Sequence, residues 1–122
     1  MTTMTNVQHG ELHAKAHAAG MAAGEACVPT PVQWMNAHTG EKFAPEPEGM
    51  CGFAWINVKP GTSSFARWLK RADLARKAYY GGLDIWVRGF GQSHERKVAY
   101  ARAYAEVLQD AGIKAYAGDR LD

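Results

Sequence analysis

The chain has 122 residues, of which 47% are hydrophobic and 21% charged, a composition typical of one globular domain and not of a disordered segment. Two cysteines are too few for a disulfide framework, and no apolar run is long enough to span a membrane. The first ten residues lack a basic segment followed by an apolar one, so no secretory signal is expected and a cytoplasmic location is predicted.

The formal net charge of +2 hides an asymmetry along the chain. Residues 59–102 carry ten Lys and Arg against three acidic residues, a net charge of +7, whereas both flanking segments are acidic. Such a basic segment favours a polyanionic partner. A solvated basic surface is the simpler alternative.

The N-terminal part predicts disorder followed by a helix. Residues 1–8 are polar and are predicted to be disordered, which leaves residues 9–122 as a single α+β domain. Residues 11–26 are rich in alanine and predict a helix despite Gly20 and Gly24. These small residues make the helix thin enough to lie close against a flat surface.

Three histidines on this helix are spaced four residues apart. His9, His13 and His17 therefore share one helical face. Two histidines at this spacing can bind a metal, and Glu11 or Cys27 would complete the ligands, but no CxxC or HExxH motif accompanies them. We expect a solvated or packing face and no metal site.

The next segment predicts irregular structure and then a clear strand. Residues 32–35 follow two prolines and predict a short edge strand, and residues 36–49 predict a long connection or a wide hairpin. Residues 51–58 alternate in the period of a strand. One side of this strand carries Ala54, Ile56 and Val58, and the other carries Phe53, Trp55 and Asn57.

The second half of the chain predicts two further units. After Pro60-Gly61, a helix capped by Thr62, Ser63 or Ser64 has an apolar stripe of Phe65, Trp68, Leu69 and Ala72 and an outer face of Arg67, Lys70 and Arg71. The Gly81-Gly82 turn leads to a strand over 83–88, followed by a glycine loop. Ser93 is the predicted N-cap of a long helix that ends at Gly112, a left-handed position, and residues 113–117 predict the last strand.

This element order predicts an α+β two-layer sandwich: a mixed sheet of three to four strands, two amphipathic helices on one face, and the N-terminal helix. The other face would carry Phe53, Trp55, Trp86 and Phe90, with Arg88 and Trp34 beside them. A face this apolar needs a cover, which the N-terminal helix, a second subunit or a stacking ligand would supply. Aromatic rings beside arginine on a sheet bind single-stranded nucleic acids.

The glycine loop is the second candidate site, with a plain strand-to-helix turn as the alternative. Free N–H groups at the start of a helix bind phosphate. The helix dipole disfavours cations in the first turn, so their presence there favours a bound anion. The predicted ligand-binding residues are Gly89, Gly91, Gln92 and Ser93 for phosphate contacts, Arg88, Arg96 and Lys97 for charge, and Trp55 and Trp86 for stacking. The loop matches neither a P-loop nor a dinucleotide fingerprint, so no cofactor is predicted.

The sequence offers little for catalysis. Cys51 would need a distant histidine to act as a nucleophile, and a small buried cysteine is the commoner case. The chain has no GxSxG motif and no pair of carboxylates with catalytic spacing. A binding protein is therefore favoured over an enzyme.

Several short motifs make the chain resemble a known family of proteins. They are Cys51 to Trp55 (CGFAW), Ser64-Phe65 with Trp68-Leu69, Tyr80-Gly81-Gly82, Gln92-Ser93 with Lys97, and Arg120-Leu121-Asp122. Over residues 50–122 the chain resembles a family of small hypothetical proteins from tailed-phage and prophage genomes. The family has no established activity, so the resemblance implies an origin and no catalytic residues.

Together these features predict a small phage accessory protein that binds a nucleotide or single-stranded nucleic acid in the host cytoplasm. Such a protein could act against a host defence system. The alternative is a phage virion structural protein that uses its aromatic sheet face as a subunit interface, either with copies of itself or with other virion proteins. No membrane partner is expected.

Overall fold

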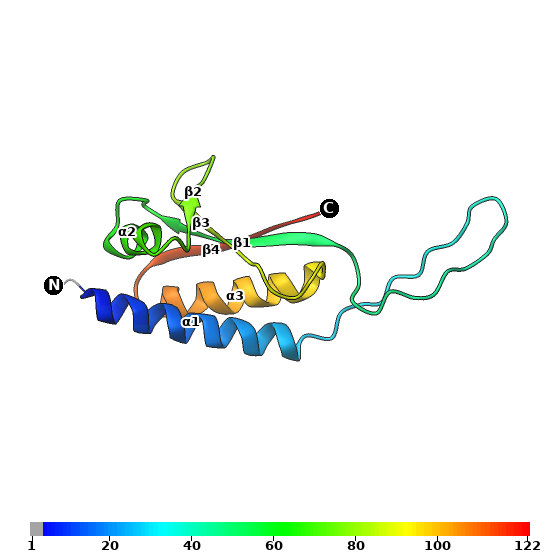
Figure 1. Cartoon of the computed structure of the whole chain (residues 1–122), viewed down its shortest axis with the longest axis horizontal. Coiled ribbons are helices and arrows are strands. Elements are labelled where there is room, and N and C mark those ends of the chain that lie inside the picture. Colours follow the sequence, from blue (N-terminus) through cyan, green and yellow to red (C-terminus); the bar gives the residue numbers. More distant parts are fainter. Residues whose placement is uncertain (1–3) are drawn as a thin grey trace.

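The computed structural model describes residues 4–122. Its elements are α1 (Asn6–Ala26), β1 (Gly52–Lys59), α2 (Ser64–Arg71), β2 (Arg76–Lys77), β3 (Leu83–Trp86), α3 (His94–Asp110) and β4 (Lys114–Leu121). The strands form one sheet in the order β2-β3-β1-β4, with α1 and α3 together on one side of it (Figure 1). The predicted α+β architecture with an N-terminal helix is confirmed.

The predicted mixed sheet is wrong in one respect, because all neighbouring strands are antiparallel. Sequence reasoning missed the two-residue strand β2, which follows α2 and pairs with β3. Gly81 and Gly82, with φ of +99° and +72°, turn the chain back between these strands. As a result, β3 lies between β1 and β2, and β1 lies between β3 and β4. The two strands that each crossover helix connects are therefore separated by a third strand. This is the ferredoxin-like order of elements.

The core lies between the sheet and the helices. Ala54, Ile56 and Val58 of β1 are completely buried, which confirms the predicted alternation. They form one cluster with apolar side chains of both amphipathic helices, among them Phe65 and Leu69 of α2, and Tyr104 and Leu108 of α3.

The helix ends follow local signals. The side chains of Ser63 and Ser93 cap α2 and α3, as predicted, and Gly112 has the left-handed φ of +83°. Because α2 ends at Arg71, Ala72 is exposed and does not extend the apolar stripe. Strand β4 continues to Leu121, four residues beyond the predicted end.

Helix α1 is longer than predicted. It begins at Asn6, where Thr5 and Gln8 form a capping box, so residues 6–8 are helical and not disordered. Residues 1–3 of the predicted disordered segment lie outside the described residues.

Of the three covers considered for the sheet face that carries Phe53, Trp55 and Trp86, the N-terminal helix is not the one used. Helix α1 packs along α3, on the opposite side of the sheet (Figure 1). Its glycines allow this close approach: a Cβ on Gly20 would lie 2.6 Å from the ring of Tyr100, and one on Gly24 would overlap Phe90. The flat surface that the thin helix meets is therefore made of aromatic rings on α3 and the preceding loop.

Residues 32–46 form a hairpin, called here the arm, that projects from the body along its longest axis (Figure 1). Isolated bridges at Val32–Glu46 and Met35–Lys42 hold its two sides together. The predicted wide hairpin is thus present, but residues 32–35 are not an edge strand of the main sheet, and Trp34 does not join the sheet face.

Candidate functional site

The side of the sheet that faces away from the helices is lined with aromatic rings. The rings of Trp55 on β1 and Trp86 on β3 lie 4.9 Å apart between centroids, and Phe53 meets Trp86 edge-on at 6.4 Å. Tyr116 of β4 points to the same side, because it pairs with Asn57 in the β1–β4 register. We call these four rings (Phe53, Trp55, Trp86 and Tyr116) the aromatic face.

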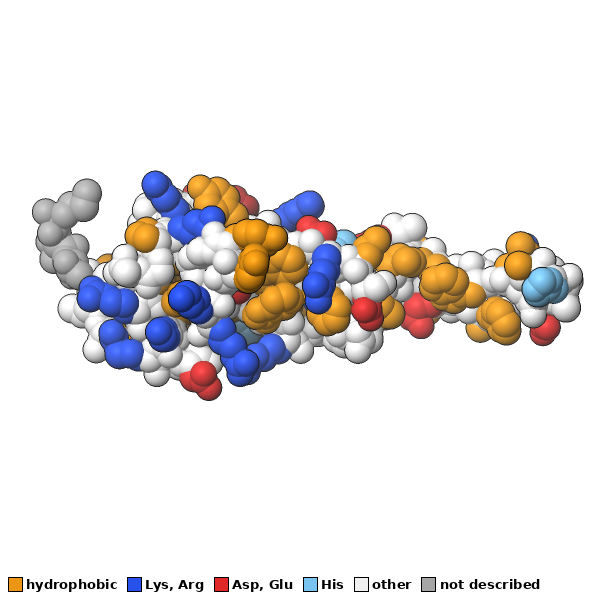
Figure 2. Space-filling model, turned by 90° about the horizontal axis from the view of Figure 1, so that it is seen from above, with side chains coloured by type: hydrophobic (Ala, Val, Ile, Leu, Met, Phe, Trp, Pro, Cys, Tyr) orange, Lys and Arg blue, Asp and Glu red, His pale blue; other side chains and the backbone are white. Residues whose placement is uncertain are grey.

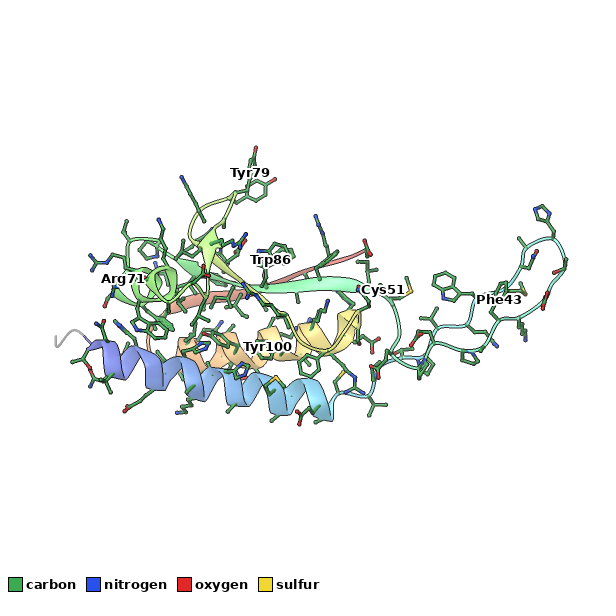
Figure 3. The ribbon with its side chains drawn as sticks, viewed as in Figure 1. Phe43, Cys51, Arg71, Tyr79, Trp86 and Tyr100 are labelled. Atoms are coloured by element: carbon green, nitrogen blue, oxygen red, sulfur yellow. The ribbon has the colours of Figure 1, made fainter. Side chains whose placement is uncertain are left out.

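No element of residues 4–122 covers the aromatic face. Trp86 is 40% exposed and Tyr116 57% exposed, although large aromatic side chains are usually well buried in a folded domain. Figure 3 shows Trp86 on the upper side of the sheet and Tyr100 on the helical side, with the sheet between them. An uncovered cluster of this kind indicates a binding surface.

The ring of Trp55 rests on the backbone of the neighbouring strand. Gly118 lies directly opposite Trp55 in the β1–β4 register. A Cβ on Gly118 would lie 2.5 Å from the nearest atoms of the indole. Glycine is therefore needed here for Trp55 to lie across β4, and this position places the half-buried ring beside Trp86.

Positive side chains surround the aromatic face. The guanidinium of Arg120 lies 5.2 Å from the centroid of Phe53, within the range of a cation–π contact. Lys59 and Lys114 pair across β1 and β4, and their register places them on the same side as the rings. Seen from above, hydrophobic side chains gather in the middle of this surface, with Lys and Arg side chains on either side (Figure 2).

The carboxylate of Asp84 lies on the same side of the sheet as the rings. Asp84 of β3 pairs with Asn57 and with Arg76 in register, and its Oδ1 accepts a hydrogen bond of 2.9 Å from the amide of Asn57. The same amide donates to the carbonyl of Gly81 at 3.0 Å. Asn57 thus holds Asp84 against the sheet and secures the turn before β3.

The aromatic face is also concave. A hollow of about 500 Å³ runs over β1, β3 and β4 and includes Trp55, Trp86 and Tyr116. The turn between β2 and β3 forms its wall, and Tyr79 and Tyr80 on that turn are 93% and 87% exposed. Figure 3 shows Tyr79 standing above the sheet on this turn. A hollow with aromatic walls and a cationic rim suits a flat anionic ligand.

The structure gives the cations of the glycine loop partners within the chain. The Nε of Arg96 donates to Glu48 at 2.6 Å, and its Nη1 donates to the carbonyls of Gly24 and Glu25 at 2.8 and 3.1 Å. Ser93 is 1% exposed and donates to the carbonyl of Glu48 at 2.9 Å. These two side chains join the end of α1, the base of the arm and the start of α3.

Lys97 is also directed inward. It is 6% exposed, and its Nζ donates to the carbonyl of Gly52 at 3.2 Å and lies 5.5 Å from the centroid of Phe53. It therefore supports the aromatic face from within and does not extend into solvent.

The remaining residues of the glycine loop are only partly accessible to an anionic ligand. Gly89, Gly91 and Gln92 are exposed, as is Arg88 next to Trp86. The hollow of about 460 Å³ beside Gly91 and Gln92 is lined by the carboxylate residues Glu25 and Glu48 as well as by Arg96. Phe90 was predicted on the aromatic face, but it packs between Gly24 and Tyr100 on the helical side. The predicted site is thus divided: Trp55 and Trp86 lie together on the sheet, apart from the loop.

The three histidines of α1 lie against aromatic side chains. His13 and His17 are hydrogen-bonded through Nδ1 to the phenols of Tyr104 and Tyr100, at 2.7 and 2.6 Å. His9 is 2% exposed and is hydrogen-bonded to Ser64 at 3.1 Å. The packing face that was one of the two expectations is present.

Burial changes the acid–base behaviour of these pairs. It lowers the pKa of His13 below its usual value of 6.5, and the charge of His17 lowers it further. It raises the pKa of Tyr100 to about 12 and raises the pKa of Tyr104 as well. The tyrosines therefore stay neutral, and His13 favours its neutral form.

Among residues 4–122, no group of three or more His, Cys, Asp or Glu side chains is placed to hold a metal ion. Cys51 is exposed and not buried as expected, and both cysteines are free.

Several residues of this surface were missed in the sequence: Lys59, Lys114, Tyr116, Gly118 and Arg120. The last four alternate along β4, and that period of two is the signal that extends the strand beyond residue 117.

Comparisons of the chain with protein-family models, with curated proteins and with solved structures give no match. Within the described part of the chain, no helix combines the length and apolar character needed to cross a membrane.

Proposed function

We propose that this protein binds single-stranded nucleic acid on its aromatic face. The observation that carries the proposal is the Trp55–Trp86 pair on an uncovered sheet surface with Lys59, Lys114 and Arg120 around it. Every base has a π-face that can stack on an indole, and phosphates follow a cationic rim. Open four-stranded sheets of RNA-binding modules hold bases on aromatic side chains in this way.

The arrangement favours a strand over a single nucleotide at the glycine loop. A nucleotide there would depend on Ser93 and Arg96, whose polar groups already bond to Glu48, Gly24 and Glu25. The carboxylates of Glu25 and Glu48 beside the loop would repel a phosphate. On the aromatic face, by contrast, several cations accompany several rings, as a chain of nucleotides requires.

An accessory role in a phage-infected bacterium, including interference with host defence, is the biological setting that we propose for this binding. It rests on the resemblance in residues 50–122. The alternative role, a virion subunit that uses the same aromatic face as an interface, is supported by the same exposed rings.

Titration of a fluorescent oligonucleotide tests the proposal. Trp86→Ala should weaken binding by about 1–3 kcal/mol, or roughly 5- to 150-fold, because one stacking ring is lost. Gly118→Ala should also weaken binding, because its methyl group displaces the Trp55 ring without removing it. Circular dichroism of both variants checks that the fold is retained.

The outcomes separate the two roles. Binding to single strands that falls in both variants supports the nucleic-acid role. No binding to any oligonucleotide at low salt would reject it and leave the subunit interface as the use of the aromatic face.

A further inference from the structure

The arm is an apolar projection without a partner in the described chain. Trp34, Met35 and Phe43 are 56%, 59% and 52% exposed. The N–H of Phe43 donates to the carbonyl of Trp34 at 2.9 Å, so both aromatic residues lie at one level of the arm. A two-stranded hairpin alone is marginally stable in water, and exposed rings on it add a further cost. These features indicate that the arm rests on another surface.

The base of the arm is held firmly against the body. Glu48 pairs with Arg96, and its carbonyl accepts from Ser93. On the other side, the N–H of Thr30 donates to the Glu95 carboxylate at 2.7 Å. These three contacts at the start of α3 therefore fix the direction in which the arm leaves the domain.

This direction prevents the arm from reaching its own aromatic face. Figure 3 shows Phe43 on the arm, far along the long axis from Trp86 on the sheet. Because the base is fixed, the arm cannot fold back without losing the contacts of Ser93 and Arg96. The surface that it meets must belong to another molecule.

The aromatic face of a second copy has the matching chemistry. The arm carries Glu41 and Glu46 against Lys42, whereas the sheet side carries Lys59, Arg76, Lys114 and Arg120 against Asp84. Both surfaces have exposed aromatic rings, and their net charges are opposite. Opposite charges around an apolar centre are typical of protein interfaces.

We propose that two copies of this chain exchange arms, each placing Trp34 and Phe43 on the aromatic face of the other. The exchange is reciprocal, so both exposed surfaces of each copy become buried. It also blocks the surface used by nucleic acid, and the arm and the nucleic acid then compete. That competition rests on the proposed function, whereas the exchange of arms does not.

The association is tested by analytical ultracentrifugation of the full chain over a range of concentrations. The wild type should show a reversible monomer–dimer equilibrium. An arm variant, Trp34→Ser with Phe43→Ser, and a face variant, Trp86→Ala, should each be monomeric where the wild type is dimeric. Val7→Ser, which removes an apolar side chain from α1 that is 69% exposed, should dimerise as the wild type does. Thermal unfolding confirms that each variant is folded.

Mixing the two monomeric variants gives the sharpest result. The arm variant keeps its aromatic face and the face variant keeps its arm, so the mixture should form a heterodimer through one remaining contact. A mixture that stays monomeric at the highest concentration reached would overturn the proposal, as would a monomeric wild type or a dimeric arm variant.

A second readout separates this inference from the proposed function. If both hold, an oligonucleotide should dissociate the wild-type dimer, and the arm variant should bind the oligonucleotide more tightly than the wild type. If the dimer forms and no oligonucleotide binds, the exchange of arms stands and the nucleic-acid role fails. If Trp86→Ala weakens oligonucleotide binding in a chain that never dimerises, the reverse holds.

Discussion

Gly20 of α1 shows how one missing methyl group sets the distance between two helices. Three ring atoms of Tyr100 would lie within 2.6–2.9 Å of a Cβ at this position. Tyr100 has little freedom to move away, because it is buried and hydrogen-bonded to His17. Glycine costs the helix about 1 kcal/mol relative to alanine, so close packing against the ring must offset that loss.

Gly20→Ala should therefore lower the free energy of unfolding by about 1–2 kcal/mol, since overpacking outweighs the gain in helix propensity. Gly10 in the same helix provides the control, because its Cβ would meet Trp68 at an ordinary 3.6 Å. Gly10→Ala should raise the free energy of unfolding by about 0.5–1 kcal/mol. Urea unfolding measures both, and equal stabilisation by the two substitutions would contradict this account of the α1–α3 contact.

The histidines on α1 predict a pH dependence of stability. Burial, with the neighbouring His17 charge, lowers the pKa of His13 in the folded state below the 6.5 of the unfolded chain. Between these two pKa values the unfolded state binds more protons than the folded state, so stability decreases as the pH falls. The stabilisation is complete above about pH 6.5 and is lost as the pH drops through the folded pKa.

Thermal unfolding between pH 7.5 and 5 should show this decrease, and His13→Gln should make it smaller. His38→Gln, on the exposed tip of the arm, should leave the pH profile of the wild type unchanged. A profile that is identical in the wild type and His13→Gln would show that other groups cause the dependence.

Among the elements, α3 depends on its N-cap residue more than α2 does. The hydroxyl of Ser93 caps α3 and also donates to the carbonyl of Glu48 at the base of the arm. Ser63 caps α2 by accepting from the N–H of Ala66. Both are N-caps, but Ser93 is buried and joins two elements.

Ser93→Ala should cost about 2–3 kcal/mol, because the loss of a cap is combined with the loss of the hydrogen bond to the Glu48 carbonyl. Ser63→Ala should cost about 1 kcal/mol, the usual value for a cap alone. Chemical denaturation compares the two. Equal costs would mean that the bond from Ser93 to Glu48 contributes nothing to stability.

In the whole molecule, the basic middle of the chain is divided among several surfaces. Arg67, Lys70 and Arg71 are exposed on α2, as predicted. Arg96 and Lys97 point inward, and Lys59 and Arg76 lie on the side of the sheet that carries the aromatic rings. Strand β4 adds Lys114 and Arg120 from the mildly acidic C-terminal segment. The charge that serves the proposed function is thus gathered by the fold from separate parts of the sequence.

If this surface binds a single strand through about four phosphate contacts, the slope of log K against log salt should be near −3, at roughly −0.7 per contact. Lys59→Gln and Lys114→Gln should each reduce the slope by about 0.7. Lys15→Gln removes the same charge from the exposed side of α1 and should leave the slope unchanged. Equal effects of all three substitutions would indicate a general electrostatic attraction without a defined site.

The local features of this fold could be read directly from the residues. The alternation of β1, the serine caps and the left-handed Gly112 follow from interactions within a few positions along the chain. For the same reason, Trp55 and Trp86 could be placed on one face: each side chain's direction follows from the period of its own strand.

Other features depend on which elements meet in space. Strand β2 has two residues, too few to show a periodicity in the sequence. Its pairing with β3 nevertheless places β3 between β1 and β2 and makes all neighbouring strands antiparallel. The position of α1 depends on the fit of Gly20 and Gly24 to aromatic rings that are more than 60 residues away in the sequence. That fit leaves the aromatic face uncovered.

The cations after the glycine loop show most clearly that local sequence does not determine which groups meet in the fold. Arg96 and Lys97 follow a glycine loop, a pattern that suits an anion site, but the fold brings Glu48 and the carbonyls of Gly24, Glu25 and Gly52 to them. A charged side chain can bind a ligand only when its donors are not already hydrogen-bonded to groups of the chain itself. Local sequence determined where the rings and charges stand along each element, and tertiary packing decided which of them remain open to a partner.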